Sequence, residues 1–324
     1  MKEAFRKLLA LLTLAVCFAG TNVHADDRPV KIIVGYAPGG ATDTVARFLG
    51  KYLGEELGRP VIVDNRPGGL TLIANRVLAK ADPNSLTFMV TPMTSTIFRE
   101  IMYPLKERGY SMLTDYAPVA TLTTYPLGLA VSKNLKIDNV QDFVEWIKKN
   151  PDQASYGSSS VGSHTHLIGS EFAQKTGTEM LVVPFPSNGA SAVALMGGQI
   201  PAAVITSVEI SSLQHGMQVL GIFTEERSPL LPHVKTMREQ GVDVVGGQAW
   251  MGMWAPAEAP QTDIKMMADA LQRVLGHPEV NAQLQKQFGM TSMYKSPDEM
   301  RQYQEAELEF WKGVIDRSGF TPHS

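Results

Sequence analysis

Residues Ile32–Arg47 read IIVGYAPGGATDTVAR and set a strand, a tight turn and the start of a helix next to one another. The β-branched run at the beginning predicts a buried strand. It ends in the turn at Pro38, Gly39 and Gly40, and the spacing of Val45 and Leu49 predicts an amphipathic helix directly after it. The stretch therefore predicts a βα corner, the repeating unit of an α/β sheet.

This corner has the properties of an anion site. Gly39 and Gly40 have no Cβ, so a ligand can approach the backbone, and the free N–H groups of the helix's first turn carry the positive end of its dipole. Neither G-x-x-x-x-G-K-[ST] nor G-x-G-x-x-G is present, and no lysine lies in the turn, which favours a carboxylate over a polyphosphate. A purely structural turn is the alternative. Asp43 is expected to stabilise the corner by accepting backbone N–H groups.

Residues 1–25 predict a cleavable secretory signal peptide, because basic residues precede an apolar run and a small residue ends the segment. The apolar run, Leu8–Ala19, is too short to span a bilayer, which takes about 18 residues. Cys17 is the only cysteine, so the mature chain is expected to have no disulfide, thiol nucleophile or cysteine-bound metal. Lipidation of Cys17 stays open. The predicted location is the periplasm, after export across the inner membrane.

Length and charge narrow the class of protein. The 324 residues are enough for two domains or one large α/β unit, and the formal net charge is −3. Such a mildly acidic chain is poorly suited to nucleic acid, so no nucleic-acid partner is expected. We expect a monomer without a cofactor.

Other predicted strands end in similar turns, at Asn65–Gly69, Pro92–Thr96 and Ser158–His166. In an open α/β sheet such turns gather at the carboxyl edge, where ligands bind. The chain is predicted to cross between two compact halves near Tyr125, between separate strands Tyr116–Thr124 and Leu127–Val131, and to return near residues 242–255. Residues 26–125 with 249–324 form the expected lobe 1, and residues 126–248 form lobe 2.

Two helix starts carry capping-box spacing. Asp138 with Gln141 predicts one, and Ser296 with Glu299 predicts the start of a long C-terminal helix.

Serines 158, 159, 160 and 163 lie near His164 and His166, which raises the hypothesis of an exported serine hydrolase. Val161 stands where G-x-S-x-G needs its last glycine, so the nucleophile-elbow motif fails. The two histidines lack the i, i+4 spacing of a zinc site, and no H-E-x-x-H occurs, so no metal is expected. We therefore expect His164 to make a structural hydrogen bond at a helix start. Arg66 is either a carboxylate clamp or the ion-pair partner of Asp64.

Six motifs in order resemble the substrate-binding proteins of the tripartite tricarboxylate transporter class, the Bug family. They lie at Pro38–Arg47, Asn65–Gly68, Ser158–Leu167, Gly197–Gln199, Arg227–Pro232 and Trp250–Ala257. The resemblance covers essentially the whole mature chain. It implies a type II periplasmic-binding-protein fold, α/β, with two lobes joined by two crossing segments around a ligand cleft.

The resemblance also implies the ligand-binding positions. The first βα loop and the serine loop would hold the carboxylate, and neighbouring turns would contact the rest of the ligand. These expected ligand-binding residues are Tyr36, Ala37, Pro38, Gly39, Gly40, Thr91, Met93, Thr94, Ser158, Ser159, Gly162, Ser163, His164, Phe185 and Thr206. Asp43, Asn65 and Arg66 are expected to hold the shape of the site.

Several positions depart from the family pattern. Leu70 and Thr71 replace a glycine pair, and Pro186 and Ser187 stand where Lys-Gly is common. Near Val204 an often-seen aspartate is absent. Loss of that lysine and aspartate predicts a less charged pocket, and leaves citrate, dicarboxylates and aromatic acids as candidate ligands.

The sequence thus predicts a non-enzymatic periplasmic receptor that captures a small organic carboxylate between two lobes and delivers it to the membrane permease subunits of a tripartite transporter. A ligand-binding partner of a membrane sensor kinase is the alternative hypothesis, and a serine hydrolase is the second alternative.

Overall fold

The computed structural model describes residues 28–69, 71–213 and 216–321. The predicted signal peptide and Cys17 lie outside the described residues. The strands are β1 (Val30–Val34), β2 (Val61–Asn65), β3 (Thr87–Pro92), β4 (Tyr116–Ser132), β5 (Ser155–Ser158), β6 (Leu181–Pro184), β7 (Ala202–Thr206), β8 (Met217–Ile222), β9 (Gln248–Pro256) and β10 (Thr291–Ser292). The α-helices are α2 (Ala41–Leu57), α3 (Leu72–Ala79), α4 (Ile97–Met102), α5 (Leu105–Arg108), α6 (Val140–Lys149), α7 (His164–Lys175), α8 (Asn188–Met196), α9 (Ser207–Leu213), α10 (Gln261–Gly276), α11 (Pro278–Phe288) and α12 (Pro297–Ser318).

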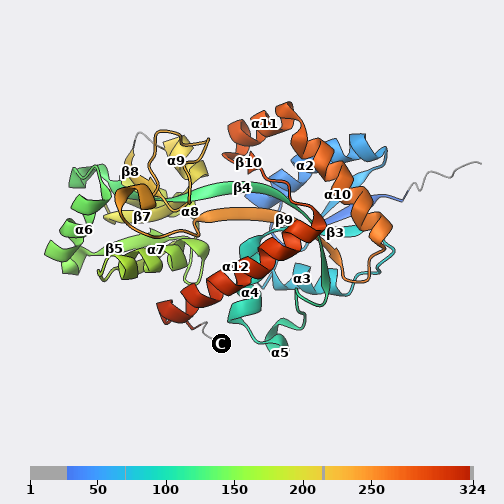
Figure 1. Cartoon of the computed structure of the whole chain (residues 1–324), viewed down its shortest axis with the longest axis horizontal. Helices are drawn as coiled ribbons and strands as arrows, with labels where there is room; N and C mark the ends of the chain where they lie inside the picture. The colour runs from blue at the N-terminus through green and yellow to red at the C-terminus, as the bar shows by residue number, and fades with distance from the viewer. Residues whose placement is uncertain (1–27, 70, 214–215, 322–324) are drawn as a thin grey trace, which may run out of the picture.

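Two long antiparallel strands, β4 and β9, run through the centre of the molecule (Figure 1). The described strands form one sheet of order β2-β1-β3-β9-β4-β7-β5-β6, with β8 and β10 also paired to β4. On one side of the central pair β1 lies between β2 and β3, parallel to both. On the other side β5 lies between β6 and β7, again parallel to both. Each flank therefore has a middle strand whose carboxyl end leads into a helix, α2 after β1 and α7 after β5.

β4 changes partners along its length. Its residues 116–126 pair with β9, and residues 127–131 pair with β7, while β8 pairs with residues 128–132. The prediction of two strands separated at Tyr125 and Pro126 is wrong, because the strand continues through both. Proline's fixed φ is compatible with extended backbone, and the next N–H, of Leu127, donates to Gly247 O at 2.7 Å, so the pairing resumes at once.

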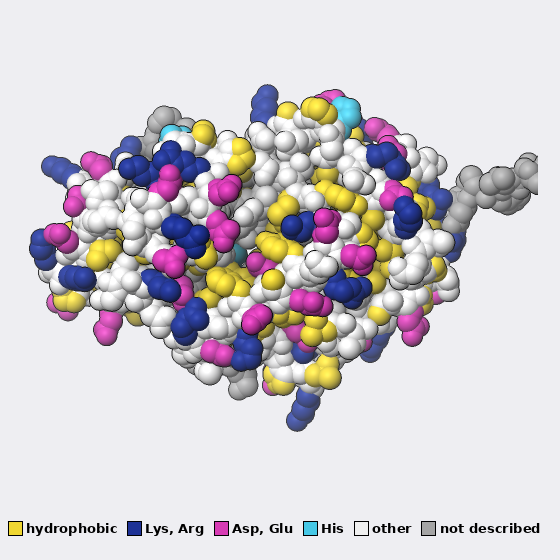
Figure 2. All heavy atoms as spheres, viewed as in Figure 1, with side chains coloured by type: hydrophobic (Ala, Val, Ile, Leu, Met, Phe, Trp, Pro, Cys, Tyr) yellow, Lys and Arg dark blue, Asp and Glu magenta, His cyan; other side chains and the backbone are white. Residues whose placement is uncertain are grey.

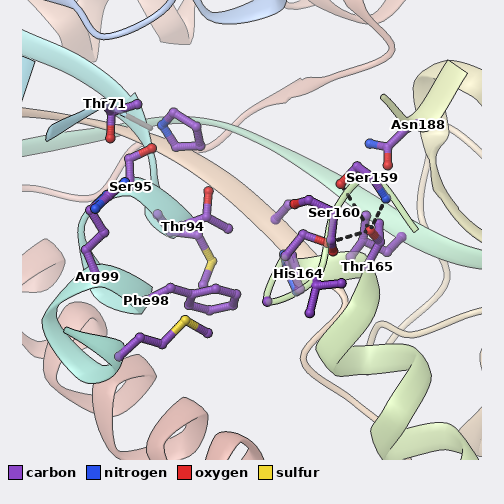
Figure 3. Close-up of a pocket in the computed structure, with 18 of the residues that line it drawn as sticks. Thr71, Thr94, Ser95, Phe98, Arg99, Ser159, Ser160, His164, Thr165 and Asn188 are labelled. Atoms are coloured by element: carbon purple, nitrogen blue, oxygen red, sulfur yellow. Dashed lines mark hydrogen bonds between the residues drawn. The ribbon is translucent and has the colours of Figure 1, made fainter. Parts of the chain in front are cut away.

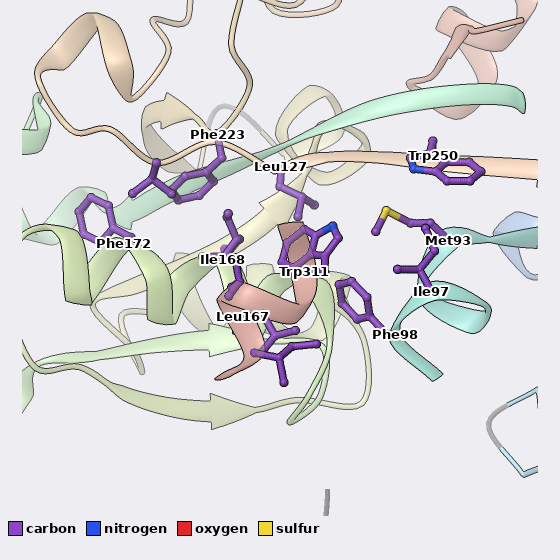
Figure 4. Close-up of a cluster of buried hydrophobic side chains, with 14 of the residues drawn as sticks. Met93, Ile97, Phe98, Leu127, Leu167, Ile168, Phe172, Phe223, Trp250 and Trp311 are labelled. Carbon is purple, nitrogen blue, oxygen red and sulfur yellow. The ribbon is translucent and has the colours of Figure 1, made fainter. Parts of the chain in front are cut away.

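Three clusters of buried apolar side chains form the core. One lies under α2 and α10, a second lies around α8 and β7, and the largest extends between them. In the largest cluster the Trp311 ring of α12 packs on Phe98 of α4 at 4.8 Å between centroids, beside Leu167 of α7 (Figure 4). Helix α12 crosses the front of the molecule diagonally and contacts both α4 and α7 (Figure 1). This helix thus connects the two flanks of the sheet through apolar contact.

The capping predictions had different outcomes. Ser296 and Glu299 form the predicted capping box at the start of α12, so that prediction is confirmed. The prediction of an Asp138 cap for α6 is wrong, because the next residue, Asn139, is the N-cap and its side chain accepts from Asp142 N at 2.9 Å. Asp and Asn are both good N-caps, and each would accept from the N–H three residues later. Which of the two caps α6 therefore depends on the residue at which the helix begins.

The surface carries interspersed charges. Figure 2 shows acidic and basic side chains mixed over the visible face, without a continuous field of one sign. Among the described residues no helix is long and apolar enough to cross a membrane.

Candidate functional site

A cavity of about 350 Å³ lies where the carboxyl ends of the two parallel flanks face each other (Figure 3). Its walls come from the loop after β1, the segment from β3 to α4, the loop between β5 and α7, and the starts of α8 and β9. The described lining residues are Tyr36, Thr71, Pro92, Met93, Thr94, Ser95, Phe98, Arg99, Met102, Tyr103, Tyr125, Leu127, Ser159, Ser160, Val161, Gly162, Ser163, His164, Thr165, Asn188, Thr206, Ala249 and Phe320.

The first corner is held by one buried carboxylate. Asp43, 2% exposed, accepts from the N–H of Gly39 at 2.8 Å, from Nε of Arg47 at 3.0 Å and from Nδ2 of Asn65 at 2.8 Å. Asn65 also donates to Tyr36 O at 3.0 Å. Burial by itself raises the pKa of Asp43, but these hydrogen bonds outweigh it and the pKa lies below its usual value. The predicted role of Asp43 in accepting backbone N–H groups at the corner is confirmed.

The side chain of Tyr36 connects the loop after β1 to the segment between β3 and α4. Its hydroxyl lies 2.7 Å from Oγ of Ser95, and burial raises the pKa of the phenol. The hydroxyl is therefore neutral and available as a hydrogen-bond donor or acceptor at the cavity floor.

Hydroxyl groups tie the serine loop to the start of α7. Oγ1 of Thr165 accepts from Ser159 N at 3.2 Å and lies 2.9 Å from Oγ of Ser158 and 3.0 Å from Oγ of Ser163. Ser163 is the N-cap of α7, and its side chain accepts from His166 N. The loop is thus a rigid hydroxyl cluster in front of a helix N-terminus, where an anion is stabilised by the dipole.

Both histidines near the serines are engaged with backbone. Because a carbonyl oxygen only accepts, Nε2–H of His164 donates to Gly246 O at 2.6 Å, and burial lowers the pKa of His164 to about 4. Nδ1 of His166 accepts from Gly162 N at 2.9 Å. The predicted structural hydrogen bond of His164 is confirmed. These bonds point neither histidine at a serine hydroxyl.

The cavity wall is positive in character. Among its described lining residues there is no aspartate or glutamate, and Arg99 is the one permanently charged side chain. Arg99 is 8% exposed and donates from Nη2 to Gly69 O at 2.7 Å. Asn188 begins a second helix, α8, whose N-cap is Ser187. Two helix N-termini and one buried guanidinium therefore face the same space (Figure 3), a combination that favours an anion.

Comparison with known proteins identifies the family of this chain. A family model described as "Tripartite tricarboxylate transporter family receptor" matches residues 45–320. The chain belongs to this family.

Relatives in the receptor family match over nearly full length. Protein BugT of Bordetella pertussis is 28% identical over 322 residues, covering 97% of this chain and 98% of that protein. The solved structure of R. palustris Rpa4515 with adipate has a TM-score of 0.80 at 27% identity, covering 92% of this chain and 99% of that one. MatC (Rpa3494) from Rhodopseudomonas palustris with bound malate has a TM-score of 0.74 at 26% identity, covering 90% and 99%.

The periplasmic binding protein BugD, with a TM-score of 0.75 at 24% identity over 92% of this chain, shares the fold. The predicted fold is thus confirmed: two α/β lobes around a ligand cleft, as in periplasmic binding proteins of this family. Its members are periplasmic solute-binding receptors and not enzymes.

The predicted ligand-binding residues divide into two groups in this receptor fold. Those that line the cavity are Tyr36, Met93, Thr94, Ser159, Gly162, Ser163, His164 and Thr206. Those outside its lining are Ala37, Pro38, Gly39, Gly40, Thr91, Ser158 and Phe185. Residues 37–40 are exposed on the loop before α2, Ser158 and Thr91 are buried behind the wall, and Phe185 packs near Gly157.

Two departures from the family pattern have structural consequences. Ser187, in place of the common glycine, caps α8 by accepting from Ala190 N at 3.1 Å. Thr206 donates from its N–H and its hydroxyl to Oε2 of Glu209, which lies behind the lining. A carboxylate thus sits close to the strand where the aspartate is absent, one layer outside the cavity wall.

The structure also resolves the alternatives for Arg66. Its guanidinium pairs with Asp64 at 2.9 Å on the surface, and it is not part of the cavity lining. Arg66 is an ion-pair partner in this structure.

Sequence reasoning missed several lining residues, above all Arg99, Phe98, Asn188 and Phe320. An arginine in the short helix after a hydroxyl-rich turn was the available signal for Arg99. Phe320 had none, because it reaches the cavity only through the length and direction of α12. Among the described residues, no group of three or more His, Cys, Asp or Glu side chains is arranged to hold a metal ion.

Proposed function

We propose that this protein captures a small organic carboxylate between its two lobes in the periplasm and delivers it to the membrane permease subunits of a tripartite transporter. The observation that carries the proposal is the charge of the cavity. Its described lining holds no carboxylate, while Arg99 and the N-termini of α7 and α8 all stabilise negative charge.

Residues from both proposed lobes line the cavity. Tyr36, Thr94 and Arg99 belong to residues 26–125, and Ser159 and Asn188 belong to residues 126–248. Strand β4 pairs with β9 on one side of the sheet and with β7 and β8 on the other, so we place one crossing segment within β4. The other lies directly before β9, where Gly247 O accepts from the N–H of Leu127. Residues 249–324 complete lobe 1, and residues 1–25 are the proposed signal peptide.

Relatives support the class of ligand. The neighbours solved with adipate and with malate are 27% and 26% identical to this chain, and both ligands are small carboxylates. Delivery to a permease follows from the family, whose description names a transporter receptor. We propose that the receptor acts as a monomer and needs no cofactor.

A thermal-shift screen of the purified mature protein tests the proposal. The panel contains carboxylates, amino acids, sugars and phosphate esters at equal ionic strength. A ligand at 100 times its Kd stabilises the folded state by about 2.7 kcal/mol, a readily measured rise in Tm. We expect carboxylates to give the rise. A response to sugars or phosphate esters alone contradicts the proposal.

A further inference from the structure

One side of the cavity is apolar, and part of it comes from the C-terminus. Phe320 follows α12 and lies against the serine loop: a Cβ built on Gly162 would be 2.7 Å from its Cζ. Its ring also meets the ring of His166 edge-on, 5.6 Å between centroids. Gly162, at φ +78°, thus allows an aromatic ring to lie directly on the loop that carries the hydroxyl cluster.

Val161 adds to this surface from within the loop itself. It stands between Ser160 and Gly162 in a run of polar residues, lines the cavity, and is 47% exposed. Its side chain is not part of the buried hydrophobic core. An exposed valine at the mouth of a polar loop is therefore free to contact a ligand.

Phe98 supplies the third apolar surface, across the cavity in α4 (Figure 3). Its ring is fixed between Trp311, at 4.8 Å, and His164, at 5.8 Å. Phe98 lines the cavity, and because it is only 3% exposed its ring is held rigidly by these neighbours. Phe98, Val161 and Phe320, which we define as the apolar wall, come from three separate segments of the chain and converge on one space.

We propose that this apolar wall selects carboxylates with a hydrocarbon chain or an aromatic ring over hydroxylated acids. The inference rests on the proposed function and deepens it. The polar groups bind the carboxylate, and the body of the ligand lies on the wall, where burial of hydrocarbon is favourable. A hydroxyl group placed there loses its hydrogen bonds to water without a replacement, which weakens binding by about tenfold or more.

Isothermal titration of the purified mature protein with four acids tests this inference. Adipate and benzoate are the hydrocarbon probes, and malate and citrate are the hydroxylated ones. At one pH and salt concentration, we expect adipate or benzoate to bind at least tenfold more tightly than either hydroxylated acid.

Two variants link the preference to the wall. Phe320→Ser and Val161→Ser are each expected to weaken binding of the preferred hydrocarbon acid by about fivefold to tenfold. Any affinity for malate should change less than twofold. Phe288→Ser is the matched control, because Phe288 is a phenylalanine at the C-terminal end of α11, packs on Phe48 at 5.4 Å and lies outside the cavity. The Tm of each variant establishes that it is folded. Because Val161 is exposed, Val161→Ser still tests the inference if Phe320→Ser fails to fold.

The outcomes separate the two proposals. Tighter binding of malate or citrate than of both hydrocarbon acids overturns the inference and leaves the proposed function standing. Unchanged affinity for the hydrocarbon acid in both serine variants also overturns it. If none of the four acids binds, the inference is wrong, and the wider thermal-shift panel decides whether the proposed function is wrong as well.

Discussion

The N–H of Gly39 donates a hydrogen bond to Oδ2 of Asp43 at 2.8 Å, tying the turn before α2 to the first turn of that helix. The same carboxylate accepts from Arg47 and Asn65, and Asn65 holds the carbonyl of Tyr36. One buried side chain thus fixes the path of the loop that brings Tyr36 to the cavity.

Asp43→Ala is expected to lower the free energy of unfolding by about 1–3 kcal/mol, because it leaves several donors without their acceptor. Urea denaturation measures the change. Asp64→Ala is the control, since the ion pair of Asp64 with Arg66 lies at the surface and contributes about 1 kcal/mol or less to the free energy of unfolding. The pKa of Asp43 is lowered by folding, so its contribution is present at neutral pH and is lost as the pH falls below about 4. Equal losses in the two variants would contradict this role.

At Gly39 the backbone conformation itself disfavours any residue with a side chain. Its φ is +84°, and a Cβ there would meet nothing within 4 Å. Gly39→Ala is therefore expected to cost about 1–2 kcal/mol through the left-handed backbone alone. Gly40, with φ −72°, is the matched control, and Gly40→Ala should cost less although its Cβ would lie 3.3 Å from Ala37 O. Urea denaturation of both variants checks the order, and a larger loss at Gly40 would refute it.

The sequence predicted the local elements of this fold well, for physical reasons that lie within short segments. The capping box of Ser296 and Glu299 and the turn at Gly39 depend on neighbouring residues only. The βα corner at Gly39 and the serine loop could be predicted because a strand, small residues and a helix start follow one another along the chain. These patterns are visible within one short segment, although Asn65 of β2 also supports the corner once the chain is folded.

The cavity wall depended on long-range packing, which no local pattern contains. Phe320 reaches Gly162 because α12 is long and crosses both flanks of the sheet. Residues 37–40 are exposed and lie outside the cavity lining, whereas Tyr36 of the same loop lines the cavity, so contact of residues 37–40 with a ligand stays a prediction. The direction in which a loop residue points is set by its tertiary partners, here Ser95 for Tyr36.

Glu307 of α12 is expected to make stability depend on pH. Burial raises the pKa of this carboxyl to about 7, although Oε2 accepts from Nε1 of Trp311 at 3.0 Å. Because the folded state holds the proton more tightly, this stabilisation is complete below pH 4.5 and is lost as the pH rises through about 7.

Glu307→Gln keeps an acceptor and removes the titration. Between pH 5 and pH 8 the wild type should therefore lose more stability than the variant, by at most about 3 kcal/mol. Thermal unfolding at the two pH values measures the difference, and Glu309→Gln, an exposed neighbour, serves as the control. Parallel changes in the wild type and Glu307→Gln would rule out this source of pH dependence.

Arg99 supplies the one permanent charge among the described residues that line the cavity, so its removal should weaken binding of a carboxylate. Arg99→Met is expected to raise the Kd of the most tightly bound acid about tenfold or more, a loss of about 1.4 kcal/mol, and Arg99→Lys should retain part of the affinity. Arg76→Met is the matched control: Arg76 also donates to backbone carbonyls, of Glu107 and Arg108, but lies outside the cavity. Isothermal titration gives each Kd. If Arg99→Met and Arg76→Met bind the acid as tightly as the wild type, the role of the buried guanidinium is structural, as in its hydrogen bond to Gly69 O, and the helix N-termini balance the charge of the ligand.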